Sequence, residues 1–297
     1  MIHEYISRRK MYEQNLRLWY PVNTFHEEKC IRKNHNYDIL NEVNYIKGEC
    51  LMKLQRLLSY VRRTVDDYTM IENGDRIAIG ASGGKDSTTM LMALANLRRF
   101  YPKKFELEAI TVSLGLPGSD FTPLTKLCES LGVRHTVIET DIGEILFDIR
   151  KESNPCSLCA KLRKGAFNAK VKELNCNKLA YGHNKNDVIE TLFLSMFYEG
   201  RMYCFSPVTY LDRTDLTCIR PLIYVPEDDI KGFIKANNLP IVKNPCPANG
   251  NTKRQQIKEF ILENALIYNN LEEKLFGAIQ RSEIKGWKVG DPIGRLS

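Results

Sequence analysis

Apolar positions follow two different spacings along the chain, and the two alternate between residues 50 and 268. From 50 to 68, leucines and valines recur every three or four positions, which is typical of an amphipathic helix. Short apolar runs predict buried strands at 76–81, 106–113, 134–140 and 178–182. Longer periodic stretches predict helices at 87–100, 122–131, 159–174, 187–197, 227–237 and from 252 to about 268.

The alternation of strands and helices predicts the fold class. We expect an α/β protein with a parallel sheet and helices on both faces, because parallel strands need crossover connections that helices usually supply. No linker rich in proline or glycine divides the chain, so one domain is expected over 51–270. Residues 1–50 form a polar N-terminal extension, which we expect to be helical, and 271–297 form a C-terminal tail that looks loose from 286 onward.

The composition is that of a globular protein, since 43% of the 297 residues are hydrophobic and 27% are charged. These values exclude a collagen-like chain and a chain that is disordered throughout. No apolar run is long enough to predict a membrane span, and the N-terminus lacks the apolar core of a signal peptide. We therefore expect a cytoplasmic protein without membrane contact, whose nine cysteines are mostly reduced.

A glycine-rich segment separates the strand at 76–81 from the next helix, and it reads Ser82-Gly83-Gly84-Lys85-Asp86-Ser87. Such a loop lies at the carboxyl end of a parallel strand, where open sheets bind ligands. Its glycines permit a tight turn that presents backbone N–H groups to an anion, and the next helix adds the positive end of its dipole. Lys85 supplies a mobile positive charge, and Asp86 can reach Mg²⁺. The spacing differs from the P-loop and dinucleotide motifs, so it predicts a phosphate site of another kind.

Basic residues are concentrated around three cysteines. The chain has a formal net charge of +7, yet the segments 150–172 and 231–258 each carry +6. The first segment contains Cys156 and Cys159, and the second contains Cys246. Neighbouring cations favour the thiolate that binds metals, and they attract phosphodiesters. A pair of solvated helix faces would give the same charge pattern.

The Cys-x-x-Cys spacing leaves four interpretations open. The pair could be a redox pair of thioredoxin type, or two small side chains packed at the start of a helix. A zinc site requires four ligands, so Cys176 or a histidine would have to complete it. An iron–sulfur cluster can use Cys156, Cys159 and Cys246 and leave one iron without a protein ligand.

Five stretches of the sequence carry a resemblance to a known family. They are MIENGDRIAIGASGGKDSTTML (70–91), PCSLCAKLRKGAF (155–167), YGHNKNDVIETLFLSMFYEGRM (181–202), RPLIYVPEDDIKGF (220–233) and PCPANGNTKRQ (245–255). The segment SGGKDS alone resembles the signature of the PP-loop ATP pyrophosphatases, which cleave ATP between its α- and β-phosphates. The full set resembles the tRNA 2-thiocytidine synthetase (TtcA) family from about Leu51 to Glu263.

This resemblance implies an ATP-dependent tRNA-cytidine 2-sulfurtransferase with a Rossmann-like sheet. ATP would activate O2 of a cytidine in the anticodon loop as an adenylate, and sulfur would then replace that oxygen. The implied cofactors are ATP, Mg²⁺ and a [4Fe–4S] cluster on Cys156, Cys159 and Cys246. The implied partners are tRNA, a cysteine desulfurase or other sulfur donor, and a second copy of the chain in a homodimer.

The resemblance also assigns residues of the nucleotide site. Lys85, Asp86 and Asp187 are the expected catalytic residues, with Asp187 holding Mg²⁺ or orienting the activated base. The expected ATP-binding residues are Ala81, Ser82, Gly83, Gly84, Lys85, Asp86, Ser87, Ser113, Gly182 and His183. Two alternatives stay open from the sequence: another PP-loop tRNA thiolase that acts on a uridine, and a zinc-stabilised RNA-binding protein without catalysis.

Overall fold

A six-stranded sheet lies at the centre of the computed structural model, which describes residues 38–151, 155–242, 246 and 253–290. Its strands are β1 (Asp75–Gly80), β2 (Phe105–Val112), β3 (Arg134–Ile138), β4 (Lys178–Ala180), β5 (Val208–Leu211) and β6 (Leu216–Ile219). Their order across the sheet is β3-β2-β1-β4-β6-β5, and neighbours are parallel except for β5 and β6. The predicted α/β class and the four predicted strands are confirmed. The antiparallel edge strand β5 departs from the expected all-parallel sheet.

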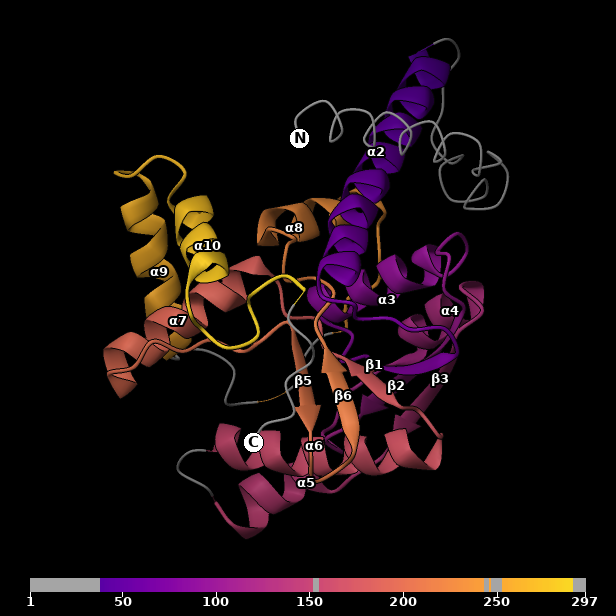
Figure 1. The fold of residues 1–297 in the computed structure, drawn as a ribbon. Helices are drawn as coiled ribbons and strands as arrows, with labels where there is room; N and C mark the ends of the chain where they lie inside the picture. Colours follow the sequence, from indigo (N-terminus) through magenta and orange to yellow (C-terminus); the bar gives the residue numbers. More distant parts are fainter. Residues whose placement is uncertain (1–37, 152–154, 243–245, 247–252, 291–297) are drawn as a thin grey trace. The chain divides into compact units, whose positions relative to one another are not determined.

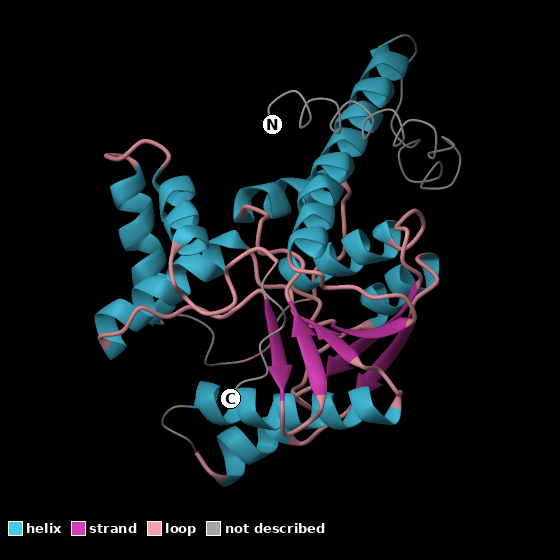
Figure 2. Ribbon diagram, viewed as in Figure 1, coloured by secondary structure: helices cyan, strands magenta, loops and turns pink. Residues whose placement is uncertain are grey.

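Helices cover both faces of this sheet, with α6 on one side and α3 and α4 on the other (Figures 1 and 2). Among the described residues, no helix is both long and apolar enough to cross a membrane. The helices are α2 (Asp38–Asp67), α3 (Lys85–Leu97), α4 (Thr122–Ser130), α5 (Ile142–Glu144), the π-helical turn η1 (Ile145–Ile149), α6 (Pro155–Glu173), α7 (Lys185–Glu199), α8 (Glu227–Ala236), α9 (Lys253–Ala265) and α10 (Leu271–Arg281).

The core forms on both faces of the sheet because successive side chains of a strand point in opposite directions. Ala78 of β1 and Ile110 of β2 belong to a buried cluster with Phe167 and Val171 of α6. On the opposite face, α3 is buried from Ser87 to Leu97. The loop between β1 and α3 is therefore anchored at both ends by buried elements.

The chain divides into two compact units, Met1–Glu49 and Cys50–Ser297. The first is described only from Asp38, where α2 begins, and this start lies well before the predicted start of the first helix at residue 50. The predicted boundaries of the N-terminal extension and of the domain at 51–270 stay predictions.

The C-terminal part contains helix α10, which the hydrophobic pattern did not predict. Phe276 and Ile279 of this helix are buried, and Trp287 beyond it is fully buried. The Trp287 ring makes edge contacts with Tyr68 and Phe276, at centroid distances of 6.1 and 5.6 Å. Trp287 is therefore anchored, contrary to the expectation of a loose tail from 286, because burial of a large indole is favourable, whereas Lys288, Val289 and Gly290 are exposed.

Candidate active site

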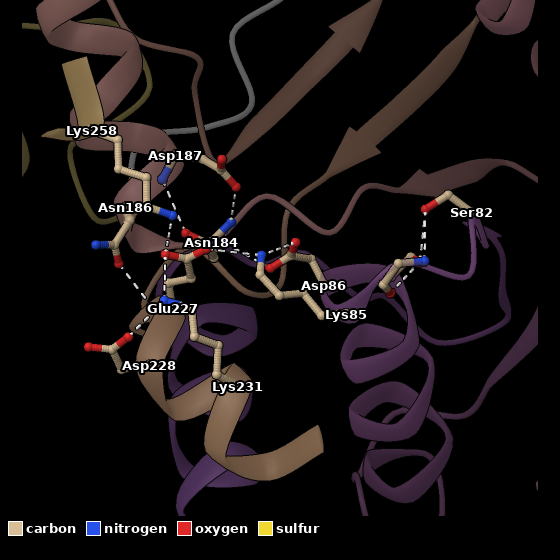
Figure 3. A network of polar contacts seen from close by, with 12 residues as sticks. Ser82, Lys85, Asp86, Asn184, Asn186, Asp187, Glu227, Asp228, Lys231 and Lys258 are labelled. Atoms are coloured by element: carbon tan, nitrogen blue, oxygen red, sulfur yellow. Dashed lines mark hydrogen bonds and ion pairs between the residues drawn. The ribbon is translucent and has the colours of Figure 1, made fainter. Parts of the chain in front are cut away.

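The glycine-rich segment connects β1 to α3 at the carboxyl edge of the sheet (Figure 3). Ala81, just before it, is buried and donates its N–H to the Ile110 carbonyl at 2.9 Å. The hydroxyls of Ser82 and Ser87 lie 3.0 Å apart, and Ser87 Oγ donates to the Gly84 carbonyl at 3.0 Å. No side chain caps the N-terminus of α3, so its first N–H groups remain available to an anion.

Two other segments approach this loop at the distance that only glycine permits. Val242 donates its N–H to the Gly83 carbonyl at 2.9 Å, and a Cβ at Gly83 would lie 2.4 Å from Val242 Cγ2. A Cβ at Gly182 would lie 3.0 Å from the Asp86 carbonyl carbon. The first contact joins the glycine-rich loop to the segment that leads to Cys246.

The turn after β4 holds two predicted catalytic carboxylates together. Asn184 and Asp187 form a reciprocal cap at the start of α7, with N–H to oxygen distances of 3.1 and 2.9 Å. Asn184 Nδ2 also donates to Asp86 Oδ1 at 2.9 Å. Burial raises the pKa of Asp187, while the Asn184 N–H and Arg254 lower it and the nearby Asp86 raises it. One asparagine thus positions carboxylates that follow two neighbouring strands, β1 and β4.

Lys85 is held in a chain of ion pairs that the sequence analysis did not anticipate. Its Nζ lies 2.7 Å from Asp86 Oδ2 and 3.1 Å from Glu227 Oε1 (Figure 3). Glu227 Oε2 in turn lies 2.6 Å from Lys258 and 3.2 Å from Lys231. Burial opposes the charge of Lys85, but Asp86 and Glu227 outweigh it and raise the pKa of Lys85. Burial also opposes the charge of Glu227, but Lys258 and Lys85 lower its pKa to about 2.

A polar cavity of about 170 Å³ lies beside this chain of ion pairs. It is lined by Lys85, Asn184, Asp187, Glu190, Glu227, Arg254, Gln255 and Lys258. Arg254 lies 2.9 Å from Glu190 and 3.6 Å from Asp187. Burial raises the pKa of Glu190, and the hydrogen bond from Arg254 opposes that shift. The cavity therefore combines three carboxylates with three cationic side chains next to the glycine-rich loop.

The other two predicted nucleotide-binding residues, Ser113 and His183, follow the two strands that flank β1. Ser113 is buried after β2, and its Oγ accepts the Gly115 N–H at 3.3 Å. His183 follows β4, and its ring lies 4.6 Å from that of Phe205. Burial, with Arg220 and Arg254 nearby, lowers the pKa of His183 to about 3, so the imidazole is neutral. The buried Nδ1 of His183 has no hydrogen-bond partner among the described residues.

The three predicted metal ligands come from two segments. Cys156 is exposed in the first turn of α6, whereas Cys159 and Cys246 are half-buried. Burial raises the pKa of Cys159, Arg163 lowers it, and the charges of Cys246 and Cys156 raise it. Cys156 and Cys246 are therefore close enough to Cys159 for their charges to act on it. Within the described ranges, no group of three His, Cys, Asp or Glu side chains has the arrangement needed to hold a single metal ion.

Cys176, the alternative fourth ligand, lies after the end of α6, whereas Cys156 and Cys159 lie at its start. It is buried after α6, where its N–H donates to the Val171 carbonyl at 3.0 Å. Burial raises the pKa of its thiol to about 11, with Glu108, Arg76 and Arg134 as its charged neighbours. These residues lie toward the amino ends of the strands, opposite the edge that carries the glycine-rich loop.

The fold and the site together define a nucleotide-binding α/β protein whose phosphate loop follows the first strand of a largely parallel sheet. The model of the PP-loop domain family matches residues 54–265. A tRNA-cytidine(32) 2-sulfurtransferase of Syntrophotalea carbinolica is 38% identical over 237 residues, which are 79% of this chain and 90% of the relative. A relative of the same name from Teredinibacter turnerae is 36% identical, and the match covers 82% of this chain and 81% of the relative. The chain belongs to the PP-loop family and, within it, to the tRNA-cytidine(32) 2-sulfurtransferases.

A solved structure supports the fold at a greater distance. The U34-tRNA thiolase NcsA from Methanococcus maripaludis, with its [4Fe-4S] cluster, superposes with a TM-score of 0.63. The match covers 76% of this chain and 77% of that one, at 24% sequence identity. The architecture of the sheet and its helices is therefore shared with a known tRNA thiolase.

Proposed function

We propose that this chain is an ATP-dependent tRNA sulfurtransferase that converts a cytidine of the anticodon loop to 2-thiocytidine. The observation that carries this proposal is the convergence of Lys85, Asp86 and Asp187 at a glycine-rich loop that also contacts the segment leading to Cys246. The membership of the family supports the choice of cytidine and of O2 as the target atom.

The reaction divides into two balanced steps. In the first, cytosine O2 forms a bond to the α-phosphorus of ATP while the bond to the β-phosphate oxygen breaks and pyrophosphate leaves. In the second, a sulfide forms a bond to C2, the C2–O bond breaks, AMP leaves with the oxygen, and the remaining proton passes to solvent. Activation is needed because an oxygen bonded only to carbon is a poor leaving group, whereas AMP is a good one.

The residues of the loop serve the first step by stabilising charge. In this proposal the uncapped N-terminus of α3 and the Lys85 ammonium group stabilise the negative charge of the ATP phosphates. Asp86 and Asp187 fit a Mg²⁺ ion, because this ion is commonly held by one or two carboxylates together with substrate phosphates. In this proposal Mg²⁺ supplies charge neutralisation at the phosphates when it is bound.

The cysteines fit an iron–sulfur cluster because Cys156 and Cys159 lie one turn apart at the start of α6 and the charge of Cys246, from a second segment, acts on Cys159. Cys156, Cys159 and Cys246 would hold it, and a [4Fe–4S] cluster with three protein ligands supplies a site that can carry sulfide when bound. Burial raises the pKa of Cys159, and Arg163 opposes that shift and so favours the thiolate that such a cluster requires.

Substrate tRNA and the other partners complete the proposal. Lys161, Arg163 and Lys164 of α6 supply positive charge beside Cys156 and Cys159, where a phosphodiester backbone would approach. A cysteine desulfurase or another sulfur donor would deliver the sulfide, the protein would act in the cytoplasm, and a homodimer is the proposed assembly. Sedimentation of the purified protein measures the last of these.

Nucleoside mass spectrometry of tRNA from a deletion strain tests the proposed function. The strain should lack 2-thiocytidine, the wild-type gene should restore it, and a gene encoding Lys85→Ala should not. Loss of a thiouridine in its place would identify the uridine thiolase alternative. Zinc without acid-labile sulfide in anaerobically purified protein would identify the RNA-binding alternative.

A further inference from the structure

The cavity beside the glycine-rich loop collects cationic groups from two distant parts of the chain. Lys85 belongs to the loop, whereas Arg254 and Lys258 belong to α9. The two α9 residues are four positions apart, which places them on the same face of the helix. This face contacts the cavity while α9 packs against α7. None of the expected ATP-binding residues lies on α9.

Each of these cations is held by a carboxylate that is more buried than itself. Glu227 bridges Lys85 and Lys258, and its side chain is 10% exposed, compared with 29% for Lys258. Glu190 pairs with Arg254, and their side chains are 7% and 44% exposed. The anions therefore form the floor of the cavity, and the cations are long side chains nearer its rim that can exchange partners.

The bridging position of Glu227 shows where a ligand anion could bind. Its carboxylate lies between two ammonium groups at 3.1 and 2.6 Å, as a phosphate oxygen would in a phosphate site. The cavity as a whole pairs three cations with three carboxylates, so a bare polyphosphate would add uncompensated negative charge. A polyphosphate that arrives with a divalent cation adds less net negative charge, because its phosphates pair with the cations and the metal pairs with the carboxylates.

We propose that Arg254 and Lys258, together with Lys85, form the subsite for the β- and γ-phosphates of ATP and for the pyrophosphate that leaves. This inference rests on the proposed function and extends it from the loop to α9. The size of the cavity agrees, since about 170 Å³ is enough for a group several times the size of one water. RNA phosphates share this chemistry, but Lys85 of the glycine-rich loop lines the same cavity, which favours the nucleotide.

Binding measurements on the full-length protein test the subsite. ATP with Mg²⁺, inorganic pyrophosphate with Mg²⁺, AMP and tRNA are titrated separately into wild-type, Arg254→Ala and Lys258→Ala proteins. Lys253→Ala is the matched control, because it removes a positive charge from the same helix while its Nζ lies over the Tyr198 ring at 4.3 Å, outside the cavity lining. Far-ultraviolet circular dichroism verifies folding, and Arg254→Lys replaces Arg254→Ala if the latter unfolds.

The subsite predicts that each cavity variant weakens binding of ATP and pyrophosphate by roughly tenfold, the usual effect of losing one charged hydrogen bond. Binding of AMP and tRNA should stay unchanged, and Lys253→Ala should bind all four ligands normally. Unchanged ATP affinity in the cavity variants would overturn the subsite and leave the proposed function intact, as would loss of tRNA binding alone. A wild-type protein that binds neither ATP nor pyrophosphate would contradict the subsite and the proposed function together.

Discussion

The close contact between Gly83 and Val242 makes Gly83→Ala the most informative single change. Gly83 has a φ of +77°, where alanine is strained, and an added Cβ would lie 2.4 Å from Val242 Cγ2 and 2.6 Å from its Cβ. The loop or the Val242 segment must therefore move. Because Val242 also donates its N–H to the Gly83 carbonyl, the movement should disturb both the nucleotide loop and the position of Cys246.

The expected loss of stability follows from two contributions. A left-handed conformation costs alanine about 1–2 kcal/mol, and overpacking costs a further 1–3 kcal/mol, roughly. Gly74→Ala is the matched control, because Gly74 immediately precedes β1, has a φ of +86°, and has nothing within 4 Å of the added carbon. The control should show only the backbone cost of about 1–2 kcal/mol.

Urea unfolding, ATP titration and iron–sulfur absorbance are measured on both variants. Gly83→Ala should lose more stability than Gly74→Ala, bind ATP at least about tenfold more weakly, and hold less cluster. The double variant Gly83→Ala/Val242→Ala should lose less stability than the sum of its two single variants, because the nearest methyl group is gone. Equal stability of the two glycine variants, with normal ATP binding in both, would refute the argued contact between the loop and the cysteine segment.

Four further predictions follow from the site. Lys85→Ala should abolish ATP turnover yet keep the iron–sulfur absorbance; loss of the absorbance would show that Lys85 is structural. The pKa of Glu227 is about 2 in the folded protein, compared with an ordinary 4.5, so its contribution to stability is complete above pH 4.5 and is lost as the pH falls toward 2. In urea titrations, the difference in stability between wild type and Glu227→Gln should therefore shrink as the pH falls from 4.5 to 2. A constant difference would contradict the stabilising role of the ionised Glu227. The tRNA affinity should fall with salt with a slope of about −0.9 per phosphate contact, and charge reversal at Arg163 and Lys164 should flatten the slope; a flat wild-type curve would leave these residues as a solvated face. Cys176→Ala should keep both cluster and thiolation, whereas alanine at any of the three predicted ligands should abolish both; a full cluster without the third ligand would overturn the ligand set.

The parts of the site that follow directly from local sequence were predictable. The segment Ser82–Ser87 lies between a strand and a helix that the hydrophobic pattern predicts, so its place at the carboxyl edge follows from chain order. Asp187 also stands close to the start of a predicted helix, and there the structure places it in a reciprocal cap with Asn184.

The remaining carboxylates and cations could not be placed because their contacts join helices far apart in the sequence. Glu190, Glu227, Arg254 and Lys258 lie on α7, α8 and α9, and each reads locally as an ordinary charged helix residue. The available signals were Pro226 before Glu227, which marks a helix start, and the spacing of four between the two basic residues. The net positive charge of 231–258 suggests a surface for phosphodiesters, but Arg254 and Lys258 pair with the carboxylates of Glu190 and Glu227 instead.

The missed elements have similar physical causes. Strands β5 and β6 have four residues each, too few to show a clear alternation, and they are fixed by pairing with each other. Helix α10 and Trp287 are stabilised by contacts with Tyr224 and with Tyr68, which lies 219 residues before Trp287 in the sequence.

Adenylation at the glycine-rich loop fixes the stoichiometry of the purified reaction. Anaerobically prepared protein with its cluster is incubated with unmodified tRNA, ATP, Mg²⁺ and sulfide, and 2-thiocytidine, AMP and pyrophosphate are quantified together. We expect one AMP and one pyrophosphate for each thiolated cytidine, and none of the three products with Lys85→Ala. Thiolation of cytidine without AMP, or with ADP and phosphate as products, would contradict adenylation at the glycine-rich loop.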